Sequence, residues 1–144
     1  MEKTSKAAAG GLVKKGIVGA VILALAVGAF FAVNYVMQLQ EYKKRIADIS
    51  ISNVDLSKIP DGSYTGSYDA IMIAAKVRVD ISNHVIQDID ILYHKNERGK
   101  KAESIVNEVK SAQSLKVDTV TGATNSSKVI LKAVQNALNS GVKA

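Results

Sequence analysis

The chain has no cysteine, one proline, two histidines and only 5% aromatic residues among its 144 positions. Without cysteine it can form no disulfide, thiolate zinc site, iron–sulfur cluster or thioether-linked haem, and it has no cysteine nucleophile or acylated lipobox cysteine. The two histidines, His84 and His94, leave little material for a metal site. Any redox work of this protein therefore needs an organic cofactor.

The net charge of +6 is unevenly distributed along the chain. Residues 1–45 carry seven Lys or Arg and two Glu, whereas residues 46–144 carry twelve basic and eleven acidic residues. A nucleic-acid-binding protein needs its positive charge spread over a folded face, with aromatic side chains for stacking. Here the basic residues flank an apolar segment instead, so we expect a membrane boundary and no nucleic-acid partner.

An uncharged run of 22 residues extends from Gly16 to Met37. As a helix it would measure about 33 Å, which is enough to cross the hydrocarbon core of a bilayer. A buried core helix of this length usually keeps a polar face, and a cleaved signal peptide usually has a shorter apolar region that ends in a small-x-small site. We therefore expect an uncleaved, single-pass anchor in the cell membrane, with the lipid bilayer as a partner.

The flanking charges and the turn residues suggest how the chain is divided. Four lysines precede the apolar run and three basic residues follow it, which weakly favours an extracytoplasmic C-terminal domain. Pro60 is followed by Asp61-Gly62, a turn signature that opens the next unit. We expect a basic N-terminal tail over 1–15, a transmembrane helix over 16–37, a stalk or linker over 38–58 and a domain over 59–144.

Within the expected domain, the first half of the sequence predicts strands. Ser63–Tyr68 is rich in residues with high β-propensity, and over Ile71–Ile81 the apolar residues occupy every second position. The residues 82–84, Ser-Asn-His, have turn chemistry. These features predict two strands and the turn that leads into a third.

The third strand is expected over Val85–Tyr93, with Ile89 and Tyr93 on one face. Ile86 is out of phase with these residues. A change of phase within a strand is typical of an extra, unpaired residue, so we expect a β-bulge near Gln87.

The apolar spacing then changes from strand-like to helical. Ala102–Ala112 carries one apolar stripe on a helix that is expected to start near Gly99, and a second helix has its stripe over Val129–Leu138. Gly141 follows as a C-cap glycine. The sequence predicts an α+β fold, a small antiparallel sheet with two helices packed on one face, preceded by a single transmembrane helix.

The stretch DTVTGATNSS, Asp118–Ser127, is dense in hydroxyl groups and runs directly into the second helix. A helix N-terminus offers N–H groups and a positive dipole end, which together favour an anion. Gly122 permits close backbone approach, and Ser126 or Ser127 can cap the helix. An ordinary capped helix after a turn fits these residues equally well. Neither a Walker loop nor a GxGxxG sequence is present.

The sequence of this stretch resembles the attachment motif of the FMN-binding domain family, Asp-x-x-Thr-Gly-Ala-Thr. That domain occurs in extracytoplasmic flavin subunits of Na⁺-translocating NADH:quinone oxidoreductases and Rnf-type complexes, and in short membrane-anchored flavoproteins. The family's opening, Asp-Gly-x-Tyr-x-Gly, matches residues 61–66, and its middle resembles residues 99–103. The resemblance covers nearly all of residues 60–140.

The resemblance implies that Thr124 carries FMN through a phosphoester bond that a separate flavin transferase forms. It also implies that Asp118, Thr121, Gly122 and Ala123 are recognised by that transferase. Serine is commoner than threonine at position 121 in the family, and both residues keep the hydroxyl. The remaining residues that we expect near the cofactor are Asn125, Ser126 and Ser127, followed by Tyr93, His94, Gly99, Lys100, Ala102 and Glu103.

Several of these residues also have a purely structural interpretation. His94 at a strand end can be a solvated or capping residue, Lys100 can belong to a solvated face, and Glu103 can be a first-turn acid that stabilises its helix. The sequence alone does not decide between these roles and a contact with the flavin. No catalytic residue and no metal ligand is assigned.

Taken with the resemblance, the sequence predicts an anchored extracytoplasmic flavoprotein. It would relay electrons between a membrane oxidoreductase, or another redox partner, and a further acceptor, and it would itself be a substrate of the flavin transferase rather than a stand-alone enzyme. Two alternatives stay open. One is a flavin-dependent reductase that acts directly on a small extracellular acceptor. The other is a non-redox anchored sensor module whose hydroxyl-rich loop is only a helix cap.

Overall fold

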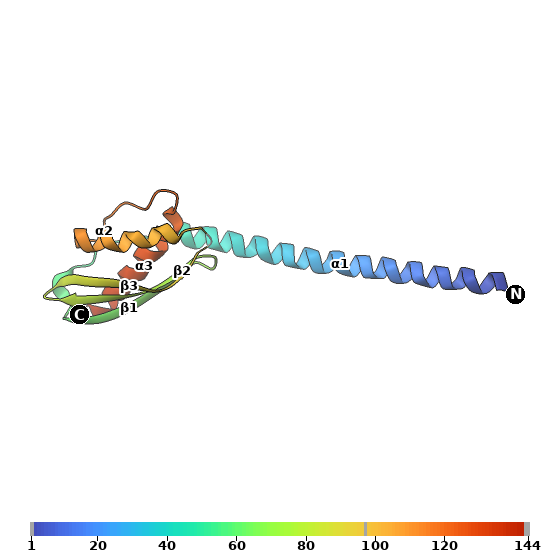
Figure 1. The fold of residues 1–144 in the computed structure, drawn as a ribbon, viewed down its shortest axis with the longest axis horizontal. Helices are drawn as coiled ribbons and strands as arrows, with labels where there is room; N and C mark the ends of the chain where they lie inside the picture. The colour runs from blue at the N-terminus through green and yellow to red at the C-terminus, as the bar shows by residue number, and fades with distance from the viewer. Residues whose placement is uncertain (1, 97, 143–144) are drawn as a thin grey trace. The chain divides into compact units, whose positions relative to one another are not determined.

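A computed structural model describes residues 2–96 and 98–142, which form two compact units, one up to Gln38 and one from Leu39 onward. The first unit is helical and belongs to α1 (Glu2–Ala47) (Figure 1). Within α1 the segment Gly10–Ala47 reaches a mean hydropathy of 2.6, and its most apolar stretch buries no side chain. Among the described residues this is the one helix that is long and apolar enough to cross a membrane.

The second unit contains a three-stranded antiparallel sheet in the order β1 (Gly62–Asp69), β2 (Ala74–Ser82) and β3 (Val85–Lys95) (Figure 1). The central strand β2 buries alternate side chains, as its sequence predicts. Asn83 and His84 form the two-residue turn between β2 and β3 with φ of 52° and 61°. Positive φ at both positions is the geometry of a type I′ turn, whose twist matches that of the flanking strands.

The strand β3 contains two irregularities in its pairing with β2. Asp80 pairs with Asp88 and Ile81 with Ile86, so Gln87 is the extra residue and the predicted bulge is confirmed. A second shift, between Lys76 and Val77, leaves Leu92 as an additional extra residue. Each extra residue reverses the faces of the side chains that follow it. Tyr93 is therefore 55% exposed, and it does not share the inner face with Ile89 as the sequence predicted.

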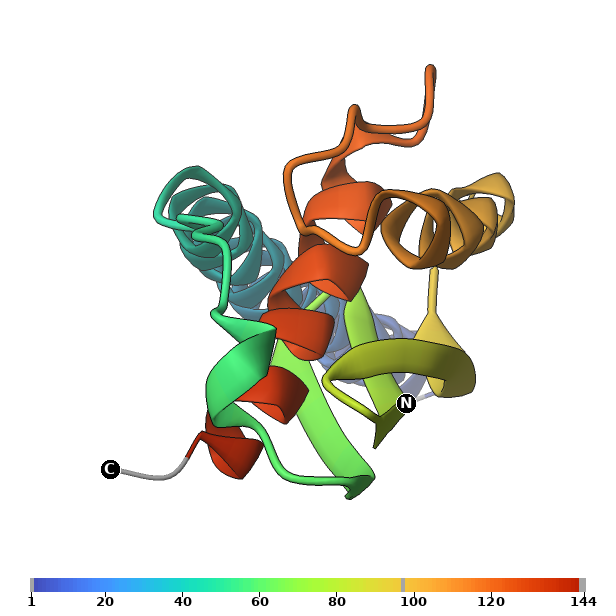
Figure 2. The same ribbon diagram turned by 90° about the vertical axis from the view of Figure 1, so that its left-hand side faces the viewer.

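The helices lie on one face of the sheet (Figure 2). The short 3₁₀ helix η2 (Lys100–Ser104) leads directly into α2 (Ile105–Ala112), which packs on β3. The longer α3 (Thr124–Gly141) packs on β1 and β2. Its inner face supplies the centre of the core. These contacts confirm the predicted α+β fold, with the first predicted helix divided into η2 and α2.

The opening motif, residues 61–66, has a structural role. The carboxylate of Asp61 accepts a hydrogen bond of 2.7 Å from the Asn83 N–H, which ties the entrance of the domain to the hairpin turn. A Cβ on Gly66 would lie 2.2 Å from the Ala137 nitrogen and 2.3 Å from the Ala133 carbonyl oxygen. A glycine at this position therefore lets the backbone of α3 rest directly on β1.

Most of the stretch 38–58, which the sequence suggested as a stalk, packs against this domain, and the second compact unit begins at Leu39. Ile46 is only 8% exposed, and the Tyr68 hydroxyl donates to the Arg45 carbonyl at 3.1 Å. The short 3₁₀ helix η1 (Leu56–Lys58) belongs to the same segment. Further along the chain, the Gln135 amide donates to the Ser52 hydroxyl at 2.6 Å. The sequence suggested a linker because this segment is polar. Local composition does not show which distant groups in the fold satisfy the polar atoms of such a segment.

Candidate functional site

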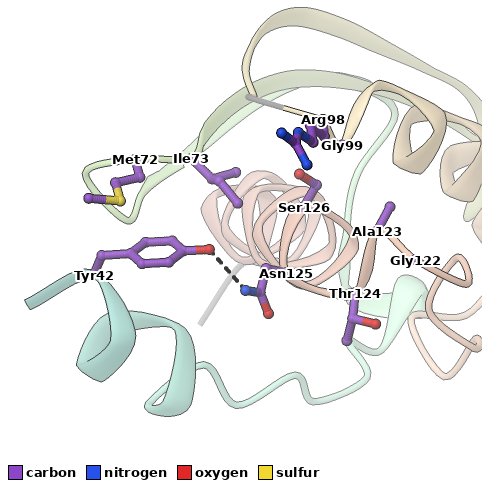
Figure 3. Close-up of a pocket in the computed structure, with 10 residues that line it drawn as sticks. All are labelled: Tyr42, Met72, Ile73, Arg98, Gly99, Gly122, Ala123, Thr124, Asn125 and Ser126. Carbon is purple, nitrogen blue, oxygen red and sulfur yellow. Dashed lines mark hydrogen bonds between the residues drawn. The ribbon is translucent and has the colours of Figure 1, made fainter. Parts of the chain in front are cut away.

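A cavity of about 380 Å³ opens beside the N-terminus of α3 (Figure 3). Small-molecule sites typically measure roughly 300–1,000 Å³, so this cavity is large enough for a ligand. Its walls come from the end of α1, the β1–β2 turn, the loop before η2 and the start of α3, all within the second unit. The lining residues are Tyr42, Met72, Ile73, Arg98, Gly99, Gly122, Ala123, Thr124, Asn125 and Ser126.

The first turn of α3 forms the polar side of this cavity. Thr124 is the first residue of the helix and is exposed at the cavity (Figure 3). The N-cap residue, Ala123, makes no side-chain cap hydrogen bond, and the first turn contains no acidic residue. The N–H groups of an uncapped first turn have no intrahelical acceptor, and the dipole makes this end positive. The arrangement places a hydroxyl group at an anion-binding helix end.

The two serines that were expected to cap this helix do not do so. The Ser127 hydroxyl instead accepts a hydrogen bond of 3.0 Å from the Val120 N–H, and Ser127 is fully buried. Ser126 is also buried and faces the cavity. The capping expectation was wrong because Ser127 lies too far into the helix and satisfies the preceding loop. Its hydrogen bond closes the loop and leaves the helix end open.

Two glycines bring other backbone segments close to the helix end. Gly122 has φ of +73°, a conformation that glycine adopts readily, and a Cβ there would lie 2.7 Å from the Lys101 ammonium nitrogen. A Cβ on Gly99 would lie 2.0 Å from the hydroxyl oxygen of Ser126. The loop before η2 thus rests directly on α3. Lys101, rather than the 85% exposed Lys100, brings its positive charge to the hydroxyl-rich loop.

The apolar side of the cavity comes from the β1–β2 turn. Ile71 in this turn has φ of +73°, which is strained for a β-branched residue. The Asp69 carboxylate accepts the Ile71 N–H at 2.6 Å, and the Lys95 ammonium donates to the Ile71 carbonyl at 2.6 Å. These two bonds hold the turn in place. The turn presents Met72 and Ile73 to the cavity, opposite the start of α3 (Figure 3).

His94 and Glu103 lie behind the loop that contains Gly99. The second bulge turns the His94 side chain inward, where it is 2% exposed, and its Nδ1 lies 3.0 Å from the Glu103 carboxylate. The His94 Nε2 is buried without a hydrogen-bond partner among the described residues. Neither residue lines the cavity. The pair ties the end of β3 to η2.

The structure brings together part of the site that the resemblance implied. Asp118 and Thr121 are exposed on the loop before α3, and Ala102 is buried in the core. The implied residues that line the cavity are Gly99, Gly122, Ala123, Thr124, Asn125 and Ser126. Those that do not line it are Asp118, Thr121, Ser127, Tyr93, His94, Lys100, Ala102 and Glu103.

Four lining residues were not expected from the sequence: Tyr42, Met72, Ile73 and Arg98. Tyr42 was assigned to the stalk, and Met72 and Ile73 were assigned to a strand. The only sequence signal for Tyr42 was an aromatic residue shortly after the apolar run, which is also typical of a membrane interface. Arg98 carried no signal beyond its proximity to the family's middle motif.

Comparison with known families gives a direct match for this region. The family model of the FMN-binding domain matches residues 72–139. The matched region begins in the β1–β2 turn and ends within α3, so it includes every lining residue of the cavity except Tyr42. Among curated proteins, none matches the chain.

Proposed function

We propose, from the match of residues 72–139 to the FMN-binding domain family, that the protein carries FMN covalently on Thr124. A flavin-binding protein is what the family match supports. The observation that carries the covalent proposal is the position of the Thr124 hydroxyl, which is exposed on the wall of the cavity at the uncapped end of α3.

The residues of the cavity suit both parts of FMN. The phosphate would be held by the N–H groups of the first turn of α3 and by the positive charge of Lys101 beside Gly122. The apolar wall that includes Met72 and Ile73 suits an aromatic ring system. When bound, FMN supplies the electron-transfer chemistry, which the side chains of this protein cannot supply.

Attachment to Thr124 requires help from another protein. Among the described residues, the lining of the cavity includes no carboxylate and no histidine, so we propose that the base that activates the Thr124 hydroxyl belongs to a transferase. The Thr124 oxygen would attack the phosphorus of an FMN donor that has a phosphoanhydride bond, such as a flavin dinucleotide. The new P–O bond forms as the anhydride bond breaks, a nucleoside monophosphate leaves, and the hydroxyl proton passes to a base of the flavin transferase. The exposed Asp118 and Thr121 are accessible for recognition by that transferase.

We further propose an electron carrier that is anchored in the membrane and faces the extracytoplasmic side. The apolar helix over residues 16–37 would be the anchor, and a membrane oxidoreductase or another redox partner would exchange electrons with the flavin. A carrier needs a held flavin and no proton-transfer group of its own. Among the described lining residues there is no carboxylate and no histidine, which favours a carrier over a reductase with its own substrate.

The test is co-expression of the full chain with a flavin transferase. Denatured wild-type protein should keep flavin fluorescence on a gel, and the peptide that contains Thr124 should gain the mass of FMN less one water. Thr124→Ala should give folded, colourless protein, whereas Thr124→Ser should remain flavinylated because it keeps the hydroxyl. Covalent flavin on the Thr124→Ala protein would overturn the assignment, and a wild-type protein without covalent flavin would overturn the covalent proposal altogether.

A further inference from the structure

We propose that Tyr42, which precedes the family-matched region by thirty positions, forms one wall of the flavin site and stacks against the isoalloxazine ring. This inference rests on the proposed function, because it assumes that FMN occupies the cavity. It adds a residue from the segment between the apolar run and the sheet to the cofactor site.

The position of Tyr42 is fixed by the domain itself. Tyr42 lies one helical turn before Ile46, whose side chain is buried in the core of the second unit. The Arg45 guanidinium donates to the Asp69 carbonyl at 3.1 Å, and the Arg45 carbonyl accepts from the Tyr68 hydroxyl at 3.1 Å. Because these contacts fix the helix at Arg45 and Ile46, the Tyr42 ring one turn earlier is held at the cavity.

A second contact joins Tyr42 to the attachment point. The Asn125 amide donates a hydrogen bond of 2.9 Å to the Tyr42 hydroxyl oxygen, and Asn125 directly follows Thr124 in the first turn of α3 (Figure 3). The aromatic ring is therefore held one residue away from the group that would carry the phosphate. The Tyr42 ring and the attachment point thus line the same cavity, in which the isoalloxazine would lie.

The chemistry of the Tyr42 wall suits a flat aromatic ligand. One side of the cavity is formed by Tyr42, Met72 and Ile73 (Figure 3). The opposite side includes Arg98 and Ser126. Tyr42 is only half-buried, so part of its ring can be covered by a ligand. Aromatic rings prefer offset-stacked or edge-to-face contacts, and methionine sulfur also packs favourably on aromatic systems.

A purely structural role for Tyr42 predicts a different outcome. In that case the Tyr42–Asn125 hydrogen bond would only fasten the helix to α3, and its loss would lower stability without changing the surroundings of the flavin. The variant Tyr42→Phe separates the two roles because it keeps the ring and removes the hydroxyl. Tyr42→Ala removes both. Tyr93→Ala is the matched control, since Tyr93 is an exposed tyrosine of β3 that does not line the cavity.

The experiment uses full-length protein that has been co-expressed with the flavin transferase and purified in detergent. Covalent FMN is measured by mass, and the access of solvent to the flavin is measured by iodide quenching of its fluorescence in the native protein. Wild type, Tyr42→Phe and Tyr93→Ala should show similar quenching constants. Tyr42→Ala should raise the constant by about twofold at equal flavin content, because the flavin face that the ring covered becomes open.

The outcomes separate this inference from the proposed function. Equal quenching in wild type and Tyr42→Ala, at equal flavin content, would overturn the stacking role and leave the covalent attachment intact. A Tyr42→Phe protein that behaves like Tyr42→Ala would also overturn it, since the hydroxyl and not the ring would then be responsible. A wild-type protein that carries no covalent flavin would overturn the proposed function and this inference together.

Discussion

Gly99 lies so close to Ser126 that a Cβ on Gly99 would sit 2.0 Å from the serine hydroxyl oxygen and 2.7 Å from the serine Cβ. The backbone of Gly99 has φ of −94°, which any residue can adopt, so the need for glycine here is one of space and not of conformation. This contact joins the loop before η2 to the first turn of α3, where the cofactor is proposed to attach.

The contact predicts that Gly99→Ala is destabilising by about 1–3 kcal/mol, as for other overpacked sites. It should also lower the yield of covalent FMN, because the loop must move away from the start of α3. Thermal unfolding and flavin content per protein measure the two effects. The double variant Gly99→Ala/Ser126→Gly, which removes the clashing side chain, should recover part of the flavin yield, and a yield as low as in the single variant would contradict the steric explanation.

A second glycine should affect the packing of α3 on the sheet. In Gly66→Ala the new methyl would meet the backbone of α3 at Ala133 and Ala137, neither of which can move without shifting the helix. We expect a loss of at least about 1–3 kcal/mol in the free energy of unfolding. The exposed neighbour Thr65→Ala is the control and should change stability much less. Equal melting temperatures for the two variants would show that α3 does not rest on β1 as described.

Thr121 should act in recognition by the transferase rather than in holding the flavin. It is exposed on the loop before α3 and does not line the cavity. Thr121→Ala should therefore lower the initial rate of flavin incorporation by a purified transferase without abolishing attachment to Thr124. Thr119→Ala, at a variable position of the same motif, should keep the wild-type rate. Flavin found on Thr121 itself would contradict the assignment.

The ion pair between α2 and β3 should give a pH-dependent contribution to stability. Lys110 donates to the Asp88 carboxylate at 2.8 Å, and this hydrogen bond, with the Ile89 N–H, lowers the pKa of Asp88 below its ordinary value of 3.8. A carboxylate whose pKa is lowered by folding stabilises the protein above its unfolded pKa, and this contribution disappears as the pH falls through the folded pKa. Wild type should therefore be more stable than Asp88→Asn at neutral pH.

The comparison is made by urea unfolding at two pH values. At a pH below the folded pKa of Asp88, the wild-type advantage should vanish because the carboxyl is then protonated in both states. The variant Lys110→Met removes the partner of Asp88, so its stability should depend less on pH than that of wild type. If wild type stays more stable than Asp88→Asn by the same amount at low pH, the difference in stability comes from packing and not from charge.

The orientation of the chain is open to a direct test. The basic residues on the two sides of the apolar run favour, by a small margin, a domain outside the cytoplasm. A protease added to intact cells should then remove the domain, and the same treatment of inverted vesicles should leave it protected. The opposite pattern would place Thr124 in the cytoplasm and remove the proposed extracytoplasmic route to flavinylation.

The sequence predicted the order of the secondary structure well because its periodicity is strong. The bulge at Gln87 was predictable because Ile86 breaks the alternation of apolar residues. The bulge at Leu92 was not predictable, because Leu92 and Tyr93 are both apolar and either one could continue the inner face. Side-chain direction after that point, including the burial of His94, depends on pairing with β2 and is not set by local sequence.

The sequence singled out the cavity-lining residues that are continuous in the chain, and it missed those that are not. Thr124 and its neighbours from Gly122 to Ser126 stand together in the chain and adjoin the cavity as a block. Tyr42 lies more than eighty positions away from Asn125, and nothing in the polar segment around it indicates that it packs on α3. Only the tertiary contacts of residues 39–58 make that segment a part of the domain.

The hydrogen bonds between this early segment and α3 also bear on when the domain folds during synthesis. Lys132 and Gln135 of α3 bond to Ser50 and Ser52, which lie 82 and 83 positions earlier. Contacts of such high sequence separation form late, and the core that α3 completes cannot close on a shorter nascent chain. The apolar face of the sheet therefore stays open until α3 has been synthesised. Thr124, as the first residue of that helix, becomes part of a folded surface only once α3 has packed on the sheet, so the proposed flavin attachment to the folded domain would have to follow that step.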